Sequence, residues 1–179
     1  GLDIPNVTMV GAILADIGFN APDFRSGERV FDLLCQVSGR AGRGQSPGTV
    51  IIQTYEPDNY AIVSAASQDY RRMYDREIQS RLDQGNPPFN QIIQFRFRHL
   101  NSTICESNAK NIAQDLKQEI TKRGLSDIEV IGPAPGTPQR IRGYYRWNIL
   151  IKGHNLHQFL SETGIPGQCQ IDVDPVHTI

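Results

Sequence analysis

Three residues whose side chains suit an anion, Gln36, Arg40 and Arg43, are spaced for one face of a helix. If a helix that begins near Val30 continues through Arg43, these positions correspond to i, i+4 and i+7 and share that face. A guanidinium stays charged and donates hydrogen bonds from a fixed fork, so a pair of them suits a phosphate. We therefore interpret Gln36, Arg40 and Arg43 as candidate catalytic residues directed at a phosphate group.

A simpler explanation is that the two arginines are solvated charges at a helix end, where the helix dipole favours cations. Gly39 and Gly42 favour the phosphate hypothesis, because a small residue beside each arginine lets another surface approach closely. A neighbouring apolar stripe would hold the helix by burial. Its expected members are Val30, Leu33, Leu34 and Val37.

The pattern Q-x-x-G-R-x-G-R at residues 36–43 resembles motif VI of superfamily 2 helicases. In that family the second arginine reaches across a cleft to the γ-phosphate of ATP bound on another lobe. The resemblance implies that Arg43 is an arginine finger, and that Arg40 and Gln36 make supporting contacts.

The opening residues, Gly-x-Asp-x-Pro, resemble helicase motif V, although a turn before a strand also explains them. In motif V the aspartate and the turn backbone help to couple the nucleotide to the bound strand. The two resemblances together imply a nucleotide-binding set of Gly1, Asp3, Gly39 and Gly42.

The elements that must position these residues are two apolar strands, 7–14 and 49–54, with the helix between them. This order and the continuous apolar character predict parallel strands covered on both faces. Two strands are too few for a stable sheet. We therefore expect part of a RecA-like lobe, cut from a longer protein, whose uncovered apolar surface leads the fragment to self-associate as a homodimer.

Four further stretches, 47–60, 86–89, 132–135 and 171–175, extend the resemblance to the primosomal protein N′ (PriA) family of replication-restart helicases. The resemblance implies an ATP-dependent DNA helicase that uses ATP and Mg²⁺ in the full-length protein, with a zinc module outside this chain. It also implies forked or single-stranded DNA, single-strand-binding protein and primosome components as partners, in the bacterial cytoplasm at the nucleoid. The fragment alone is expected to be inactive, because it has no G-x-x-x-x-G-K-[ST] loop.

Periodicity divides the chain into residues 1–57 of the RecA-like lobe, a helical connector 58–85 and a C-terminal domain 86–179. In the C-terminal domain, strand-like alternation and helical stripes follow in the order β-α-β-β-α-β, with residues 132–143 as a long loop. This order predicts a ferredoxin-like antiparallel sheet with both helices on one face. The expected fold class is α+β.

The open face of that sheet is expected to be basic and to bind single-stranded nucleic acid through phosphates and stacking. The expected binding residues are Arg96, Arg98, Arg146 and Lys152 on the sheet, and Arg140 and Arg142 in the loop. The rival explanation is pairing of the sheet arginines with Asp172 and Asp174 across the last strand. By parity Trp147 should point into the core. A non-catalytic nucleic-acid or protein interaction module is therefore the alternative function.

The composition sets limits on these hypotheses. The net charge of −1 excludes a uniformly basic nucleic-acid binder, but not local basic patches. The three cysteines are isolated in sequence, which argues against a zinc site or a disulfide framework. No apolar run reaches the roughly 20 residues of a membrane span, so we expect a soluble intracellular protein without a metal site.

Overall fold

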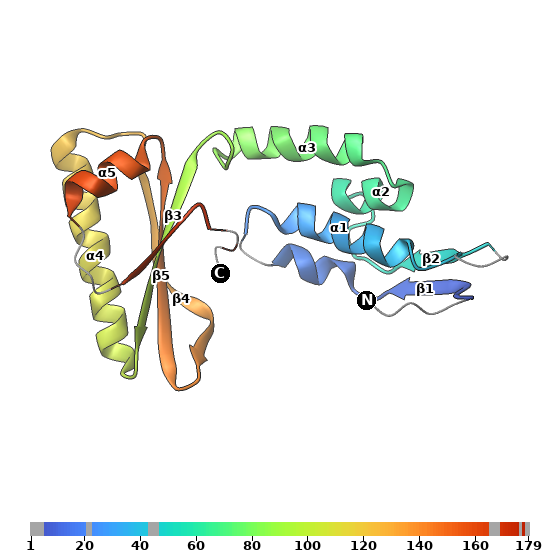
Figure 1. Ribbon diagram of the computed structural model, residues 1–179, viewed down its shortest axis with the longest axis horizontal. Helices are drawn as coiled ribbons and strands as arrows, with labels where there is room; N and C mark the ends of the chain where they lie inside the picture. Colours follow the sequence, from blue (N-terminus) through green and yellow to red (C-terminus); the bar gives the residue numbers. More distant parts are fainter. Residues whose placement is uncertain (1–5, 21–22, 43–46, 165–168, 176, 178–179) are drawn as a thin grey trace. The chain divides into compact units, whose positions relative to one another are not determined.

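The computed structural model describes residues 6–20, 23–42, 47–164, 169–175 and 177 (Figure 1). The chain divides into two compact units, Gly1–Ser80 and Arg81–Ile179. The mixture of helices with two separate sheets confirms the α+β class. The elements are β1 (Met9–Ala12), η1 (Ala15–Asn20), α1 (Ser26–Ser38), β2 (Thr49–Ile52), α2 (Tyr60–Ser67), α3 (Tyr70–Asp83), β3 (Gln91–His99), α4 (Ser102–Arg123), β4 (Glu129–Ile141), β5 (Tyr144–Gly153), α5 (Leu156–Thr163) and β6 (Gln170–Val173).

The first unit is built on the strand pair β1 and β2, which α1 connects. The strands are parallel, and their register runs from Met9 opposite Thr49 to Ala12 opposite Ile52. The predicted strand–helix–strand order and the parallel pairing are therefore confirmed. The strands pack on a helical core whose buried members are Val30, Phe31, Leu34, Ala61, Ile62, Ala65 and Met73.

One face of this strand pair lacks the cover that the sequence predicted. Ala12 and Ile52 pack against the helical core, whereas Met9 and Ile51 on the opposite face are 64% and 52% exposed. Parallel sheets are normally buried on both faces. Within the part of the chain that the structure describes, this sheet is therefore incomplete.

α1 ends at Ser38, so the prediction of a helix continuing to residue 43 is wrong. After the helix, Arg40 N donates to Val37 O at 3.0 Å, which forms a tighter turn. Gly42 then adopts φ +74°, in the left-handed region. Glycine is a poor helix former, and Gly39 and Gly42 together stop the helix before the second arginine.

Backbone contacts fix the turn that follows α1. Gly42 N donates to Val7 O at 2.9 Å, and Thr49 N donates to Thr8 O at 2.8 Å. A Cβ on Gly48 would collide with the backbone nitrogen of Gly42 and would lie 2.7 Å from the Cβ of Ala41. The turn therefore lies against the amino-terminal edge of the β1–β2 pair, and the contact requires glycine at position 48.

Residues 58–85, predicted to be a helical connector, form the two helices α2 and α3. Asn59 caps α2, because its Oδ1 accepts from Ala61 N at 3.1 Å. Asp69 accepts from Arg72 N at 2.9 Å at the start of α3. α2 contributes to the core of the first unit. The division of the chain at residues 57 and 85 stays a prediction.

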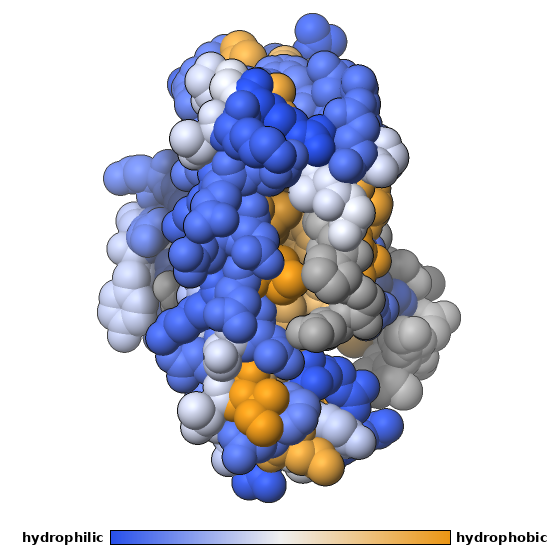
Figure 2. Space-filling view, turned by 90° about the vertical axis from the view of Figure 1, so that its left-hand side faces the viewer, coloured by the Kyte–Doolittle hydropathy of each residue, from blue (hydrophilic) through white to orange (hydrophobic). Residues whose placement is uncertain are grey.

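The second unit is a four-stranded antiparallel sheet in the order β4-β5-β3-β6, with α4 and α5 packed on one face. The side that carries the two helices has a mainly hydrophilic surface with a hydrophobic strip between hydrophilic regions (Figure 2). The predicted element order β-α-β-β-α-β is confirmed.

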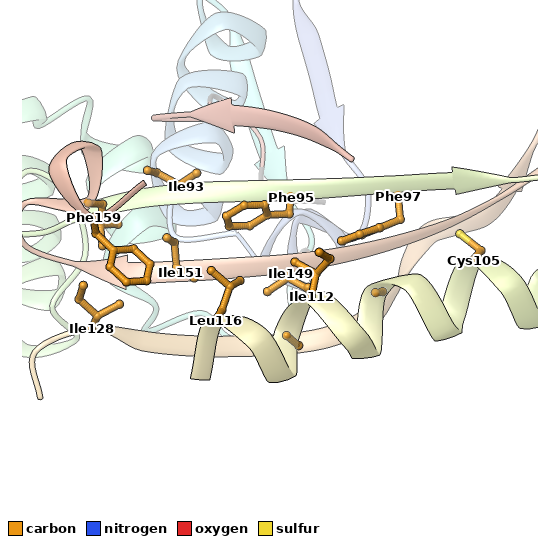
Figure 3. Packing of buried hydrophobic residues seen from close by; sticks show 13 residues of the cluster. Ile93, Phe95, Phe97, Cys105, Ile112, Leu116, Ile128, Ile149, Ile151 and Phe159 are labelled. Atoms are coloured by element: carbon orange, nitrogen blue, oxygen red, sulfur yellow. The ribbon is translucent and has the colours of Figure 1, made fainter. Parts of the chain in front are cut away.

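The core of this unit lies between the sheet and α4. Phe95 and Phe97 of β3 point toward α4, where Ile112 and Leu116 meet them (Figure 3). Trp147 also packs against this core, so its predicted inward direction is confirmed. On the opposite face of β3, Ile92 and Gln94 are also buried, and only Arg98 farther along that face is exposed.

The long loop predicted at residues 132–143 is wrong, because β4 continues to Ile141 and forms a hairpin with β5. Its pairing is irregular, with register shifts between Ile131 and Ala134 and between Pro135 and Arg140. β4 is an edge strand, where a proline without an N–H is tolerated. The prolines that suggested a loop therefore occur within an irregular edge strand.

No helix formed by the described residues is long and apolar enough to span a bilayer.

Candidate functional site

α1 positions the first candidate residues by burying one side and exposing the other. Val30, Phe31 and Leu34 are buried, while Gln36 is exposed. Leu33 was expected in the buried stripe, but it is 59% exposed. Phe31 is buried in its place, within the cluster formed with α2, and its ring also lies beside the exposed ring of Tyr70 of α3 with a centroid separation of 6.2 Å.

The side chains of Gln36 and Arg40 have no hydrogen bond or ion pair with any residue that the structure describes. Gln36 is exposed and Arg40 is half-buried. The carboxylates that would make Arg40 a structural ion pair are therefore not found among the described residues. A half-buried guanidinium on a turn held by backbone bonds remains available to an external anion.

The two glycines of the motif have different roles. A Cβ on Gly39 would have its closest contact at 3.5 Å, from Cys35 O, which is an ordinary distance. Gly42 needs its left-handed conformation, and a Cβ there would lie 2.9 Å from Gly48 N. Gly42 is therefore required by the turn itself. At Gly39 no such steric demand exists, and this agrees with a position kept small for an approaching surface.

The motif VI stretch and the strand that follows the motif V stretch meet at the bond between Gly42 N and Val7 O. Of the predicted site residues, Arg43, Gly1 and Asp3 lie outside the described residues. The sequence did not indicate the contact between Gly42 and Gly48, because only the closure of the loop brings these glycines together.

Titratable groups on α1 do not form an alternative catalytic set. Burial raises the pKa of the Cys35 thiol, and the nearby Asp32 carboxylate raises it further. Burial, followed by the negative charge of Glu28, raises the pKa of Asp32. A thiol with a raised pKa stays protonated at neutral pH and is a poor nucleophile.

The second candidate site, on the sheet of the second unit, divides into two groups of basic residues. Arg96 pairs with Asp172 at 2.6 Å, as the rival explanation anticipated, and donates to Gln94 Oε1 at 2.9 Å. Lys152 donates to Gln84 O at 3.0 Å and lies 3.7 Å from a Glu129 carboxylate oxygen. Both cations are therefore engaged within the unit.

The second group, Arg98, Arg140, Arg142 and Arg146, lies at the turn end of the β4–β5 hairpin, and we call it the arginine cluster. Arg98 and Arg146 are directly opposite in register on the open face. The guanidinium of Arg98 lies over the Tyr144 ring at 4.4 Å, and that of Arg140 over Tyr145 at 5.1 Å.

No described carboxylate pairs with any member of the arginine cluster. Arg146 donates to Pro138 O at 3.4 Å, and its stem packs on Gly136, where an added Cβ would be 3.0 Å away. The sequence grouped Tyr144 and Tyr145 with the basic residues as stacking surfaces for bases. The structure instead places arginines over both rings.

The chain is similar in sequence to one known family of proteins. The family model of the primosomal protein N C-terminal domain matches residues 83–176. The chain is 41% identical over 152 residues to the replication restart protein PriA of Bacillus subtilis, covering 85% of this chain and 18% of the relative. It is 38% identical over 184 residues to that of Rickettsia typhi, covering 98% and 27%.

The replication restart protein PriA of Treponema pallidum is 35% identical over 188 residues, which cover 100% of this chain and 28% of the relative. The chain therefore spans about a fifth to a quarter of the length of these relatives. On the match of the C-terminal domain and on these identities, the chain belongs to the primosomal protein N (PriA) family of replication restart proteins.

Proposed function

We propose that the chain supplies the arginine side of an ATP-binding cleft in a DNA helicase that restarts replication and takes part in primosome assembly. The observation that carries this proposal is the half-buried Arg40, which lies on an anchored turn without a described partner. The relatives are replication restart proteins, which supports the restart role. Work at the chromosome would put the protein in the bacterial cytoplasm, at the nucleoid.

The residues present suit one side of a nucleotide site only. Arg40 and Arg43 would contact phosphate oxygens and balance their negative charge, with Gln36 as a further polar contact and Gly39 leaving room. ATP would supply the phosphoryl group, and the sequence has no phosphate-binding loop to hold it. The loop and the acidic Mg²⁺ residues belong to a second lobe in this proposal, and the zinc module lies outside these residues.

The fold supports two finer assignments within this proposal. The parallel pair β1–β2 joined by α1 is the arrangement expected for part of a RecA-like lobe. The order β4-β5-β3-β6, with two helices on one face, is the arrangement expected for a ferredoxin-like domain.

The arginine cluster supports a second function, binding of single-stranded or forked DNA by the second unit. Arg98 and Arg146 place like charges directly opposite each other, which costs stability unless an anion relieves the repulsion. Because arginines already cover the tyrosine rings, we propose that the cluster binds mainly phosphates rather than stacked bases. Single-strand-binding protein and primosome components remain proposed partners without an assigned surface.

A chimera tests the nucleotide proposal, with this chain replacing the matching segment of the Bacillus subtilis relative. Arg43→Ala should lower kcat for ATP hydrolysis by roughly 10³-fold or more, and Arg40→Ala should lower it less. Arg71→Ala removes an exposed arginine of α3 and serves as the control. Equal kcat values for Arg43→Ala and the control would refute the finger role, as would ATP turnover by the chain alone.

Fluorescence anisotropy of a labelled oligothymidine, titrated with the whole chain at two salt concentrations, tests the DNA proposal. The double variant Arg98→Ala/Arg146→Ala should bind more weakly, and its salt slope should decrease by about 1.4, for two lost phosphate contacts. Arg96→Ala should have a smaller effect, because Asp172 already engages that side chain. Equal losses of oligothymidine affinity in Arg96→Ala and in the double variant would show that the arginine cluster has no special role in DNA binding.

The uncovered face of the first unit supports a third proposal, self-association of the chain as a homodimer. Met9, Ile13 and Ile51 are 64%, 76% and 52% exposed, and large exposed apolar patches favour association. Light scattering should give the mass of a dimer for the wild-type chain and a mass closer to that of a monomer for Ile51→Lys. A monomer mass at every concentration would contradict the proposal.

A further inference from the structure

A shallow groove runs along the outer side of α4, with Pro133 of β4 as its far wall. Its volume is about 610 Å³, and it lies apart from the arginine cluster at the hairpin turn. The α4 residues that line it include positions 110, 114, 117, 118 and 121, which recur at helical spacing on one side of the helix. This side of α4 is opposite to no other described helix and is largely exposed.

The charge of the groove is entirely positive. Three lysines, Lys110, Lys117 and Lys122, belong to its lining, and none of the described residues that line it is acidic. Lys110 lies 2.6 Å from Glu106 and Lys122 lies 3.6 Å from Glu119, but both lysine side chains remain more than 60% exposed. Lys117, in the middle of the groove, pairs with no described carboxylate. The groove therefore presents cations to an incoming ligand.

The other lining residues limit what that ligand is. Pro133 provides an apolar wall, and Gln114 and Gln118 can hydrogen-bond to a backbone. No aromatic residue lines the groove, so a nucleobase would find no ring on which to stack. Pro133 and Pro135 lack N–H groups, so a partner strand cannot simply extend the sheet at this part of β4.

From these features we propose that the α4 groove binds a short acidic segment of a partner protein, which places an apolar side chain on Pro133. Carboxylates of the segment lie beside Lys110, Lys117 and Lys122, and its backbone is within reach of the two glutamines. Charge complementarity gives the segment its orientation, since Lys110 and Lys117 lie two turns apart on one side of α4. This surface is independent of the nucleotide and DNA proposals.

Fluorescence anisotropy with two labelled peptides tests this proposal on the whole chain. One peptide alternates glutamate with leucine, and the other alternates glutamine with leucine as the uncharged control. The acidic peptide should bind and the control should bind at least tenfold more weakly. Lys117→Glu should raise the Kd of the acidic peptide at least tenfold, because it reverses the central charge of the groove.

Two matched variants distinguish binding in the groove from nonspecific electrostatic attraction between the acidic peptide and the chain. Arg142→Glu makes the same charge change at the hairpin turn, and binding should stay within about twofold of the wild type. Gln114→Trp fills the groove without changing charge, and it should weaken binding at least tenfold, while circular dichroism reports an unchanged fold. The proposal is overturned if Arg142→Glu weakens binding as much as Lys117→Glu does, if Gln114→Trp has no effect, or if oligothymidine rather than the peptide depends on Lys117.

Discussion

The backbone bond from Gly42 N to Val7 O, with the contact between Gly42 and Gly48 beside it, determines where the turn after α1 can lie. A helix end is normally a place where side chains point freely into solvent. Here the chain leaves α1, turns at a left-handed glycine and is fastened to the edge of a parallel strand pair. Arg40 is consequently presented from a fixed backbone, which lowers the entropy lost when its guanidinium binds an anion.

The basic residues of the second unit fall into two groups, according to whether a carboxylate already pairs with the arginine. Arg96 has Asp172 as its partner, and the pair is partly buried, so an external phosphate would have to displace a charge-assisted bond. Arg98 and Arg140 lie over tyrosine rings, which orient a guanidinium without neutralising its charge. An arginine held in this way keeps its affinity for anions, while its neighbour in the same sheet contributes to the structure.

The sequence predicted those features that depend on local periodicity and parity. The inward direction of Trp147 follows from strand parity and the parallel strands around α1 follow from the strand–helix–strand order, and the structure has both. The predictions failed where contacts with residues distant in sequence determine burial or strand pairing. Leu33 is exposed and Phe31 is buried, because the elements that α1 packs against determine which of its sides is buried, and β4 keeps its prolines because it is an edge strand. Of the site, the sequence predicted residue types, whereas the partners of each arginine depend on strand register.

The claim that the glycine contact holds the arginine turn in place is tested most directly by ATP hydrolysis in the chimera with the Bacillus subtilis relative. Gly48→Ala adds a methyl group against Ala41 and Gly42, whereas Gly11→Ala adds the same group on β1 with nothing within 4 Å. With both variants folded by circular dichroism, we predict that kcat decreases at least about tenfold, or about 1.4 kcal/mol, in Gly48→Ala only. Equal kcat values in the two variants would contradict the account.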